Sequence, residues 1–241
     1  AGEPIVWITA YDATFATFAD EAGVDVILVG DSLGNVVLGH PTTVTVTLED
    51  MVRATESVAR AAKRALVVAD LPFGTVGGAF ADTFAAAVRL MRAGAHAVKL
   101  EGDHPDAIRG LVRAGIPVCA HLGFTPQSVH AIGGHRAARN EDRLETELRS
   151  VTESGAFATV LELVPAALAA RLSAAVPHAI TIGIGAGPGC HGQVQVLHDV
   201  LGLGPGLRHA KAFGDLRAAT EAALGGYVRE TRAKAFPTAD H

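Results

Sequence analysis

The stretch AVKLEGDHPDAIRGLVRAGIPVCAH, residues 97–121, decides the fold. Two short apolar runs, Ala97–Leu100 and Pro117–His121, flank a helical pattern over Pro105–Ala114 that stops at Gly115. Proline at the first helical position and glycine just after the last one are typical of helix boundaries. Near-continuous apolar runs are typical of parallel strands covered on both faces. The stretch therefore predicts a β–α–β unit.

The same alternation continues in both directions along the chain. Further strand-like runs are Ile5–Thr9, Val26–Val29, Leu66–Ala69, Thr159–Leu163 and Ile180–Ile184. Further helices are expected over Ala13–Ala22, Thr47–Ala62, Phe80–Ala93, Glu141–Ser154, Pro165–Ala175 and Leu216–Thr231. Val194–Leu201 reads equally well as the eighth strand or as a helix. This rhythm predicts an α/β fold, a (β/α)8 TIM-type barrel, as one domain over residues 1–241. A doubly wound open sheet is the alternative.

Size and composition agree with one such domain and exclude other classes. A chain of 241 residues suits a single barrel, and a net charge of −5 without a Lys/Arg cluster makes nucleic acid an unexpected partner. The only cysteines, Cys119 and Cys190, form neither a disulfide framework nor a C-x-x-C motif, so we expect a reducing cytoplasm. The longest stretch free of charged residues, Leu172–His198, contains Pro177 and Pro188, so we expect no membrane helix.

Polar residues stand at or just past the C-terminal ends of six of these runs. In chain order they are Thr9, Tyr11 and Asp12; Asp31 and Ser32; Asp70; Lys99 and Glu101; His121; and Glu162. In a parallel barrel these strand ends converge on the face that carries the active site. Charged groups at the edge of an apolar core are costly unless something pairs with them. The coincidence over several strands indicates a functional site.

The residue types indicate metal-assisted chemistry on a small acid. Asp31, Asp70 and Glu101 would repel one another, and hard oxygen ligands in that number suit Mg²⁺. A 2-oxo acid offers its ketone and carboxylate as a chelating pair, and the metal would stabilise its enolate. Lys99 would neutralise the substrate carboxylate or the enolate oxygen. Glu162, which interrupts the apolar run TVLELV, is the candidate base.

Each residue also has a purely structural interpretation. Asp31 is equally well explained as the cap of the next helix. Lys99 and Glu101 lie two apart on one strand and would pair with each other, and His121 alone is more typical of a core histidine. The glycine-rich run Gly183–Gly187 does not satisfy G-x-G-x-x-G, so a dinucleotide fold is not supported.

The strand-end motifs, taken in order, resemble the ketopantoate hydroxymethyltransferase family. The matching segments are TAYDATFA, DEAGVDVILVGDSLGNVVLGH, VTLEDM, ADLPF, MRAGAHAVKLEG, IPVCAHLGFTPQSV, LELVP and GIGAG with GQVQVLHDVLG. They extend from Thr9 to about Leu203. A wider relationship to the phosphoenolpyruvate mutase and isocitrate lyase superfamily is compatible with the same barrel.

This resemblance implies Mg²⁺-dependent transfer of a hydroxymethyl group from 5,10-methylenetetrahydrofolate to 2-oxoisovalerate, which gives ketopantoate (2-dehydropantoate) for pantothenate synthesis. By motif, Asp31 of GDSLG and Asp70 of ADLPF would bind the metal, supported by Glu101 of KLEG. The resemblance also implies a large homo-oligomer, commonly a decamer.

The remaining roles follow from the same motifs. Ser32 and Lys99 would hold the 2-oxo acid, in a pocket completed by Asp31 and Asp70. Glu162 of LELVP would take the proton next to the ketone, and His121 of AHLG would line the site.

The outer segments depart from the family pattern. The departures are His191-Gly192-Gln193, Pro41–Thr47, Gly74–Gly78, Gly133–Arg139 and Leu207–His209. They leave open a paralogue that performs aldol-type chemistry on another 2-oxo acid, a C–C lyase that runs such a step in reverse, and a non-catalytic barrel. Retention of the inner charged residues favours an enzyme.

Overall fold

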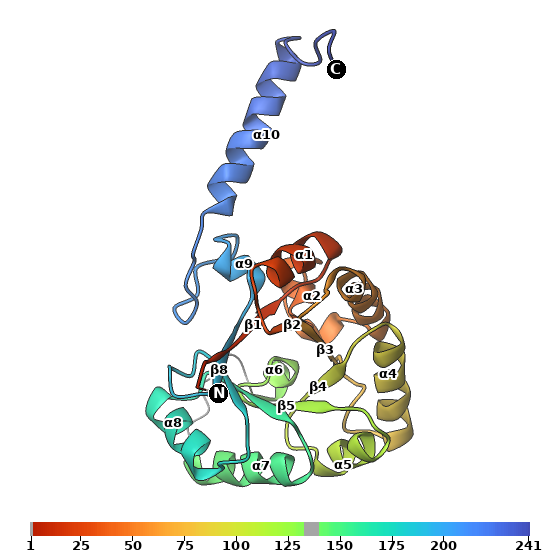
Figure 1. Cartoon of the computed structure of the whole chain (residues 1–241), viewed down its shortest axis with the longest axis vertical. Coiled ribbons are helices and arrows are strands. Elements are labelled where there is room, and N and C mark those ends of the chain that lie inside the picture. The colour runs from red at the N-terminus through yellow and green to blue at the C-terminus, as the bar shows by residue number, and fades with distance from the viewer. Residues whose placement is uncertain (1, 133–139) are drawn as a thin grey trace. The chain divides into compact units, whose positions relative to one another are not determined.

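A computed structural model describes residues 2–132 and 140–241, and its central feature is a closed barrel of eight parallel strands in the order β1-β2-β3-β4-β5-β6-β7-β8 (Figure 1). The strands are β1 (Ile5–Thr9), β2 (Val26–Val29), β3 (Leu66–Asp70), β4 (Ala97–Glu101), β5 (Val118–Gly123), β6 (Ala158–Glu162), β7 (Thr181–Ile184) and β8 (Gly192–Gln195). The predicted barrel is confirmed, and the open sheet is excluded because β8 pairs with β1 through Trp7 and Val194.

Helices surround the strands of the barrel (Figure 1). They are α1 (Ala13–Glu21), α2 (Leu33–Val36), α3 (Leu48–Ala61), α4 (Phe80–Arg92), α5 (Pro105–Arg113), α6 (Val129–Ile132), α7 (Glu141–Glu153) and α8 (Ala166–Ala175), with 3₁₀ turns η1 (Thr43–Thr45) and η2 (Pro126–Ser128). Local sequence explains their starts: Asp12 caps α1 by accepting from Phe15 N, and Thr47 and Asp50 form a capping box on α3.

The connection between β7 and β8 is unusually short. Residues 185–191 lead from the end of one strand to the start of the next without a helix. Gly185 and Gly187 turn the chain with φ of 62° and 73°, which glycine adopts without strain. Gly187 and Gly189 also lie against α8, where an added Cβ would meet Ala166 and Ala170. The glycine-rich run thus makes a tight crossover.

The side chains inside the barrel separate into an apolar layer and a polar layer. The apolar core comprises Trp7, Val26, Leu28, Val68, Ala97, Cys119, Ala158, Val160, Ile182 and Val194. Successive side chains of a strand point to opposite faces, so residues two or four positions further along point inward as well. That parity places Asp70, Lys99, Glu101, His121 and Glu162 inside the barrel, at the C-terminal ends of their strands.

The chain divides into two compact units, residues 1–196 with the barrel and residues 197–241. The second unit contains α9 (Leu197–Val200) and α10 (Leu216–Arg232), which Asp215 caps. Val194–Leu201 therefore contains both a strand and a helix, because β8 ends at Gln195 and α9 begins at Leu197. In the described residues, no helix is both long enough and apolar enough to cross a membrane.

Candidate active site

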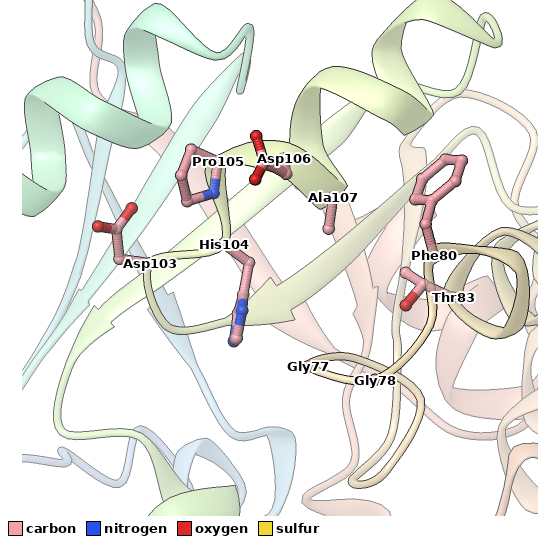
Figure 2. A pocket seen from close by; sticks show the side chains of 9 residues that line it. All are labelled: Gly77, Gly78, Phe80, Thr83, Asp103, His104, Pro105, Asp106 and Ala107. Atoms are coloured by element: carbon pink, nitrogen blue, oxygen red, sulfur yellow. The ribbon is translucent and has the colours of Figure 1, made fainter.

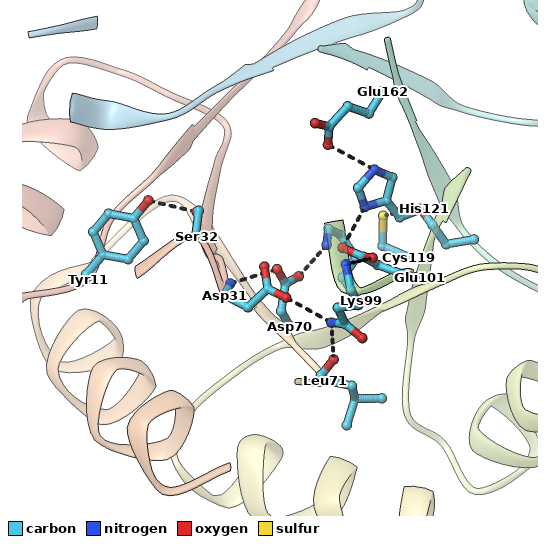
Figure 3. A network of polar contacts seen from close by, with 12 residues as sticks. Tyr11, Asp31, Ser32, Asp70, Leu71, Lys99, Glu101, Cys119, His121 and Glu162 are labelled. Atoms are coloured by element: carbon cyan, nitrogen blue, oxygen red, sulfur yellow. Dashed lines mark hydrogen bonds and ion pairs between the residues drawn. The ribbon is translucent and has the colours of Figure 1, made fainter. Parts of the chain in front are cut away.

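Five predicted site residues come together within the barrel mouth as one network of polar contacts (Figure 3). Asp31, Asp70, Lys99, Glu101 and His121 are each at most 8% exposed. Asp31 follows β2, Asp70 ends β3, Lys99 and Glu101 lie on β4, and His121 lies on β5. The polar residues predicted at the strand ends therefore form a cluster of buried charged groups.

The neighbouring strands β3 and β4 pair Asp70 with Lys99. Their Cα atoms are register partners, and Lys99 Nζ lies 2.7 Å from Asp70 Oδ1. The other oxygen, Asp70 Oδ2, accepts a hydrogen bond from the main-chain N–H of Asp31 at 3.0 Å. Burial alone would lower the pKa of Lys99, but the charges of Asp70, Glu101 and Asp31 outweigh burial and raise it. Lys99 is thus a fixed cation paired with Asp70, and not with Glu101.

Asp31 is a buried carboxyl that forms no ion pair within the described part of the chain. It does not cap the following helix, because the N-cap of α2 is Ser32; its Oδ2 accepts from Gln127 Nε2 at 2.9 Å. Burial, together with the charges of Asp70 and Glu101, raises the pKa of Asp31 to about 8. An ionised Asp31 therefore requires a further positive charge nearby.

His121 stands between two glutamates (Figure 3). Its Nδ1 lies 3.4 Å from Glu101 Oε1 and its Nε2 lies 3.2 Å from Glu162 Oε2. Burial and Lys99 both oppose protonation of the ring, but the neighbouring carboxylates of Glu101 and Glu162 raise the pKa of His121 to about 9. His121 therefore lies between two carboxylates that favour its protonated form, and it is not an isolated core histidine.

Glu162 and Ser32 lie at the edges of this network. Glu162 ends β6, and its side chain is 15% exposed, more than those of the other carboxylates. Ser32 Oγ is 2.9 Å from the Tyr11 hydroxyl, which is 2.8 Å from Thr9 Oγ1. The predicted base is thus within reach of both solvent and cluster, and the predicted substrate-binding serine is held by a chain of hydroxyl groups.

Gln127 is a site residue that the sequence analysis missed. Besides its bond to Asp31, its Nε2 donates to Leu71 O at 3.0 Å, and its main-chain N–H donates to Glu101 Oε2 at 2.9 Å. The sequence held a signal for it, because Gln127 lies in the family-matching segment IPVCAHLGFTPQSV, but no role was assigned to it. The departures at Gly133–Arg139, with His135, lie outside the described residues.

Charge and chemistry suit a divalent cation at this cluster. Among the described residues, it holds four carboxylates against two basic groups, Lys99 and His121, so a fully ionised cluster lacks two positive charges. Carboxylate oxygens are the donors that Mg²⁺ prefers. In the described ranges, no three His, Cys, Asp or Glu side chains are already arranged around one point as ligands. Binding a cation would therefore need small side-chain movements from these contacts.

A separate pocket of about 340 Å³ lies outside this network (Figure 2). Its walls are Gly77, Gly78, Phe80, Thr83 and residues 103–107, from the segments that follow β3 and β4. None of the predicted site residues lines it. The candidate active site is therefore the charged network and not this pocket.

His191 is one of the residues that depart from the family pattern, and the structure shows its contacts. Its Nδ1 accepts from Thr181 N at 3.2 Å and lies 3.0 Å from Thr181 Oγ1, and this hydroxyl is 2.6 Å from Ser173 Oγ. Thr181 begins β7, so this contact lies at the opposite end of that strand from the charged network. His191 therefore connects the start of β7 to the β7–β8 crossover, away from the charged network.

A parallel eightfold barrel with buried carboxylates, a paired lysine and a more exposed glutamate at its strand ends has the features of a barrel enzyme whose active site lies at the C-terminal ends of the strands. The model of the family described as ketopantoate hydroxymethyltransferase matches residues 1–239. The chain belongs to this family of enzymes.

Relatives agree with this assignment, and solved structures agree with the fold. The 3-methyl-2-oxobutanoate hydroxymethyltransferase 1 of Burkholderia ambifaria is 49% identical, over all of this chain and 91% of the relative. The enzyme of the same name from Burkholderia multivorans is 50% identical with the same coverage. Phosphonopyruvate hydrolase, solved with oxalate and Mg²⁺, has a TM-score of 0.65 at 15% identity and covers 99% of this chain and 88% of its own. A 2,3-dimethylmalate lyase of the phosphoenolpyruvate mutase/isocitrate lyase superfamily has a TM-score of 0.64 at 19% identity, over 96% and 83%.

Proposed function

We propose that this chain transfers a hydroxymethyl group from 5,10-methylenetetrahydrofolate to 3-methyl-2-oxobutanoate (2-oxoisovalerate) in a Mg²⁺-dependent reaction that gives 2-dehydropantoate. Family membership supports the reaction class. The observation that carries the proposal is the separation of roles in the site. Asp31, Asp70 and Lys99 form one buried charged group, while Glu162 stands apart on β6 with part of its side chain exposed.

Asp31 and Asp70 are the residues that would hold the cation, with Glu101 in support. They are adjacent, since Asp31 N donates to Asp70 Oδ2, and both present carboxylate oxygens. Bound there, Mg²⁺ supplies a Lewis acid that polarises the ketone of the 2-oxo acid. The buried environment strengthens every charge interaction in the site, because water does not screen it.

Lys99 and Ser32 would hold the acid. Lys99 offers a permanent positive charge, 2.7 Å from Asp70, against the carboxylate or the enolate oxygen. Ser32 offers a hydroxyl that Tyr11 holds in place at 2.9 Å. Together they would orient C3 of the substrate and stabilise the negative charge that develops on deprotonation.

Glu162 would remove the C3 proton, and His121 would stabilise the carboxylate before that step. Nε2 of His121 lies 3.2 Å from Glu162 Oε2, which would orient the Glu162 carboxylate. The resulting carbanion at C3 would form a C–C bond to the methylene carbon of the folate, whose two C–N bonds would break. Water would supply the hydroxyl oxygen, and tetrahydrofolate would leave with one proton from C3 and one from water on its two nitrogens. A general base placed in this way contributes typically about 10²–10⁴-fold to the rate.

Turnover with purified components tests the proposal. Formation of 2-dehydropantoate should require Mg²⁺, 3-methyl-2-oxobutanoate and 5,10-methylenetetrahydrofolate together, and should stop when EDTA is added. C3 proton exchange without product would instead indicate another one-carbon donor or acceptor. Absence of both exchange and product would refute the proposed reaction.

We also propose that the protein works as a homo-oligomer in the cytoplasm. Two free cysteines, Cys119 and Cys190, suit a reducing compartment. Leu224 and Tyr227 of α10 are 60% and 58% exposed, and α10 has no buried residue, so an assembly would give its apolar side chains a partner surface. Light scattering coupled to gel filtration measures the mass, and a monomer at micromolar concentration would contradict the assembly.

A further inference from the structure

Gln127 occupies a turn that packs closely over the charged network. It lies in η2, directly after β5, and Ser128 N donates to Thr125 O to close the turn. The other 3₁₀ turn, η1, packs against η2. It belongs to the long segment between β2 and α3. The position of Gln127 is therefore fixed by two segments that come from different parts of the chain.

The hydrogen bonds of Gln127 reach the ends of three strands. Its amide nitrogen has two hydrogens, and both have acceptors: Asp31 Oδ2 at 2.9 Å and Leu71 O at 3.0 Å. Its main-chain N–H donates to Glu101 Oε2 at 2.9 Å. Because carbonyl and carboxylate oxygens can only accept, the amide orientation is determined by its partners. One residue thus holds an oxygen of two of the three carboxylates proposed to bind the cation.

We propose that Gln127 is a positioning residue, which fixes Asp31 and Glu101 for the cation and couples cation binding to the order of the η2 turn. This inference rests on the proposed function, because it assumes a cation at the carboxylate cluster. The bond to Oδ2 of Asp31 does not use Oδ1, so a cation and Gln127 can share this carboxylate. Hydrogen-bond partners of metal ligands typically contribute about 10–100-fold to metal affinity.

Coupling follows from linkage. If an ordered Gln127 favours the cation, the bound cation must favour an ordered Gln127 by the same factor. Main-chain amides of residues 127–131 should therefore exchange with solvent more slowly when Mg²⁺ is bound. This effect has no counterpart if Gln127 merely fills space in the turn.

The first test is calorimetric titration of the full chain with Mg²⁺ alone. Gln127→Met keeps the length of the side chain and the main-chain N–H but removes the amide, and we expect its Kd to rise about 10–100-fold. Gln127→Asn withdraws the amide by one methylene and keeps a polar group in the turn, so it should weaken binding as well, and it replaces the Met variant if that variant does not fold. Ser128→Ala changes the neighbouring side chain in the same turn and should leave Kd within about twofold of wild type, since it keeps all three Gln127 contacts.

The second test is hydrogen exchange of residues 127–131 with and without Mg²⁺. We expect Mg²⁺ to slow exchange in wild type and Ser128→Ala, and to slow it less in Gln127→Met, which keeps only the main-chain bond to Glu101. A Gln127 variant that melts earlier but binds Mg²⁺ with the wild-type Kd would overturn the inference and leave the proposed function intact. Wild-type protein that binds no Mg²⁺ would overturn both.

Discussion

Lys99 Nζ and Asp70 Oδ1 lie 2.7 Å apart, with about 4% and 3% of their side chains exposed. Asp70 pairs with Lys99, while Lys99 is stabilised by Asp70 first and by Glu101 and Asp31 as well. Asp70 additionally accepts from the main chain of Asp31, so this pair joins the lysine to the proposed cation ligands. The Lys99–Asp70 pair therefore bears on both the stability of the barrel and the proposed cation site.

Replacing the lysine should be costly. Lys99→Met leaves Asp70 buried without its cation, and removal of one partner of a buried ion pair destabilises by about 3–5 kcal/mol. Urea unfolding measures the loss. The double variant Lys99→Met/Asp70→Asn should lose less than the two single losses added together, because the second change removes the uncompensated charge. Strict additivity would show that the two side chains do not interact.

Added Mg²⁺ should stabilise the folded protein through Asp31. At a free concentration of one hundred times Kd, a ligand that binds only the folded state adds about 2.7 kcal/mol to its stability. Asp31→Asn should abolish the rise in melting temperature. Asp106→Asn is the matched control, since Asp106 pairs with Arg109 outside the charged network, and this variant should respond as wild type does. An equal response from Asp31→Asn would remove Asp31 from the ligand set.

Glu162→Gln should separate deprotonation from binding. We expect exchange of the C3 proton of 3-methyl-2-oxobutanoate, followed by NMR in D₂O, to fall by about 10²–10⁴-fold. Mg²⁺ affinity should stay close to wild type, because Glu162 contacts His121 and not the two aspartates. Normal exchange in this variant would assign the base elsewhere.

Gly123 should not tolerate a side chain. Its φ of +97° strains any other residue, and an added Cβ would collide with the carbonyl oxygen of Glu162, its register partner on β6. Gly115 has φ of +84° with open space around its Cβ position, so Gly115→Ala should cost only the backbone strain, about 1–2 kcal/mol. Gly123→Ala should cost more and should also slow C3 proton exchange, because Glu162 must move. Equal losses of stability, with exchange unchanged, would show that β6 absorbs the collision.

Asp20 should make stability depend on pH. Its carboxylate accepts from Ala65 N at 2.7 Å and from the main-chain N–H groups of Lys63 and Arg64, and these bonds lower its pKa. Asp20 then binds a proton less well in the folded state than in the unfolded state, where the pKa of an aspartate is about 3.9. The stabilisation is present above that value and is lost as pH falls through the lower folded value.

Asp20→Asn should accordingly lower the urea midpoint at pH 7, and the difference from wild type should shrink towards pH 2. Asp25→Asn is a useful comparison, because Asp25 accepts one main-chain hydrogen bond, from Val6 N, where Asp20 accepts three. A difference for Asp20→Asn that persists undiminished at low pH would attribute its effect to packing and not to the charge.

The bounds of the strands could be predicted to within about two residues, because a short run of apolar residues is visible in the local sequence. Ile5–Thr9 and Val26–Val29 are strands with the predicted bounds. The residues after the predicted first strand could likewise be placed at the barrel mouth, and Tyr11 contacts Ser32 there. Val194–Leu201 was ambiguous because a strand and a short helix follow each other within it.

Partners across the ring were not predictable, because they depend on register and loop geometry. The pairing of Lys99 with Asp70, and not with Glu101, is set by the alignment of β3 against β4. Gln127 is 96 positions from Asp31 in the sequence, and the path of the turn that brings it to Asp31 cannot be read from the local sequence. The metal, substrate and base roles remain predictions, for which the network gives the geometry.

The pairing of β1 with β8 has a consequence for how the protein is made. Residues 192–195 join residues 5–8 to close the ring, and they are synthesised after every proposed site residue. A chain that lacks β8 therefore contains all of these charged residues but cannot close the ring, so β1 keeps an unpaired edge. Until β8 pairs with β1, this edge is open to association with other chains.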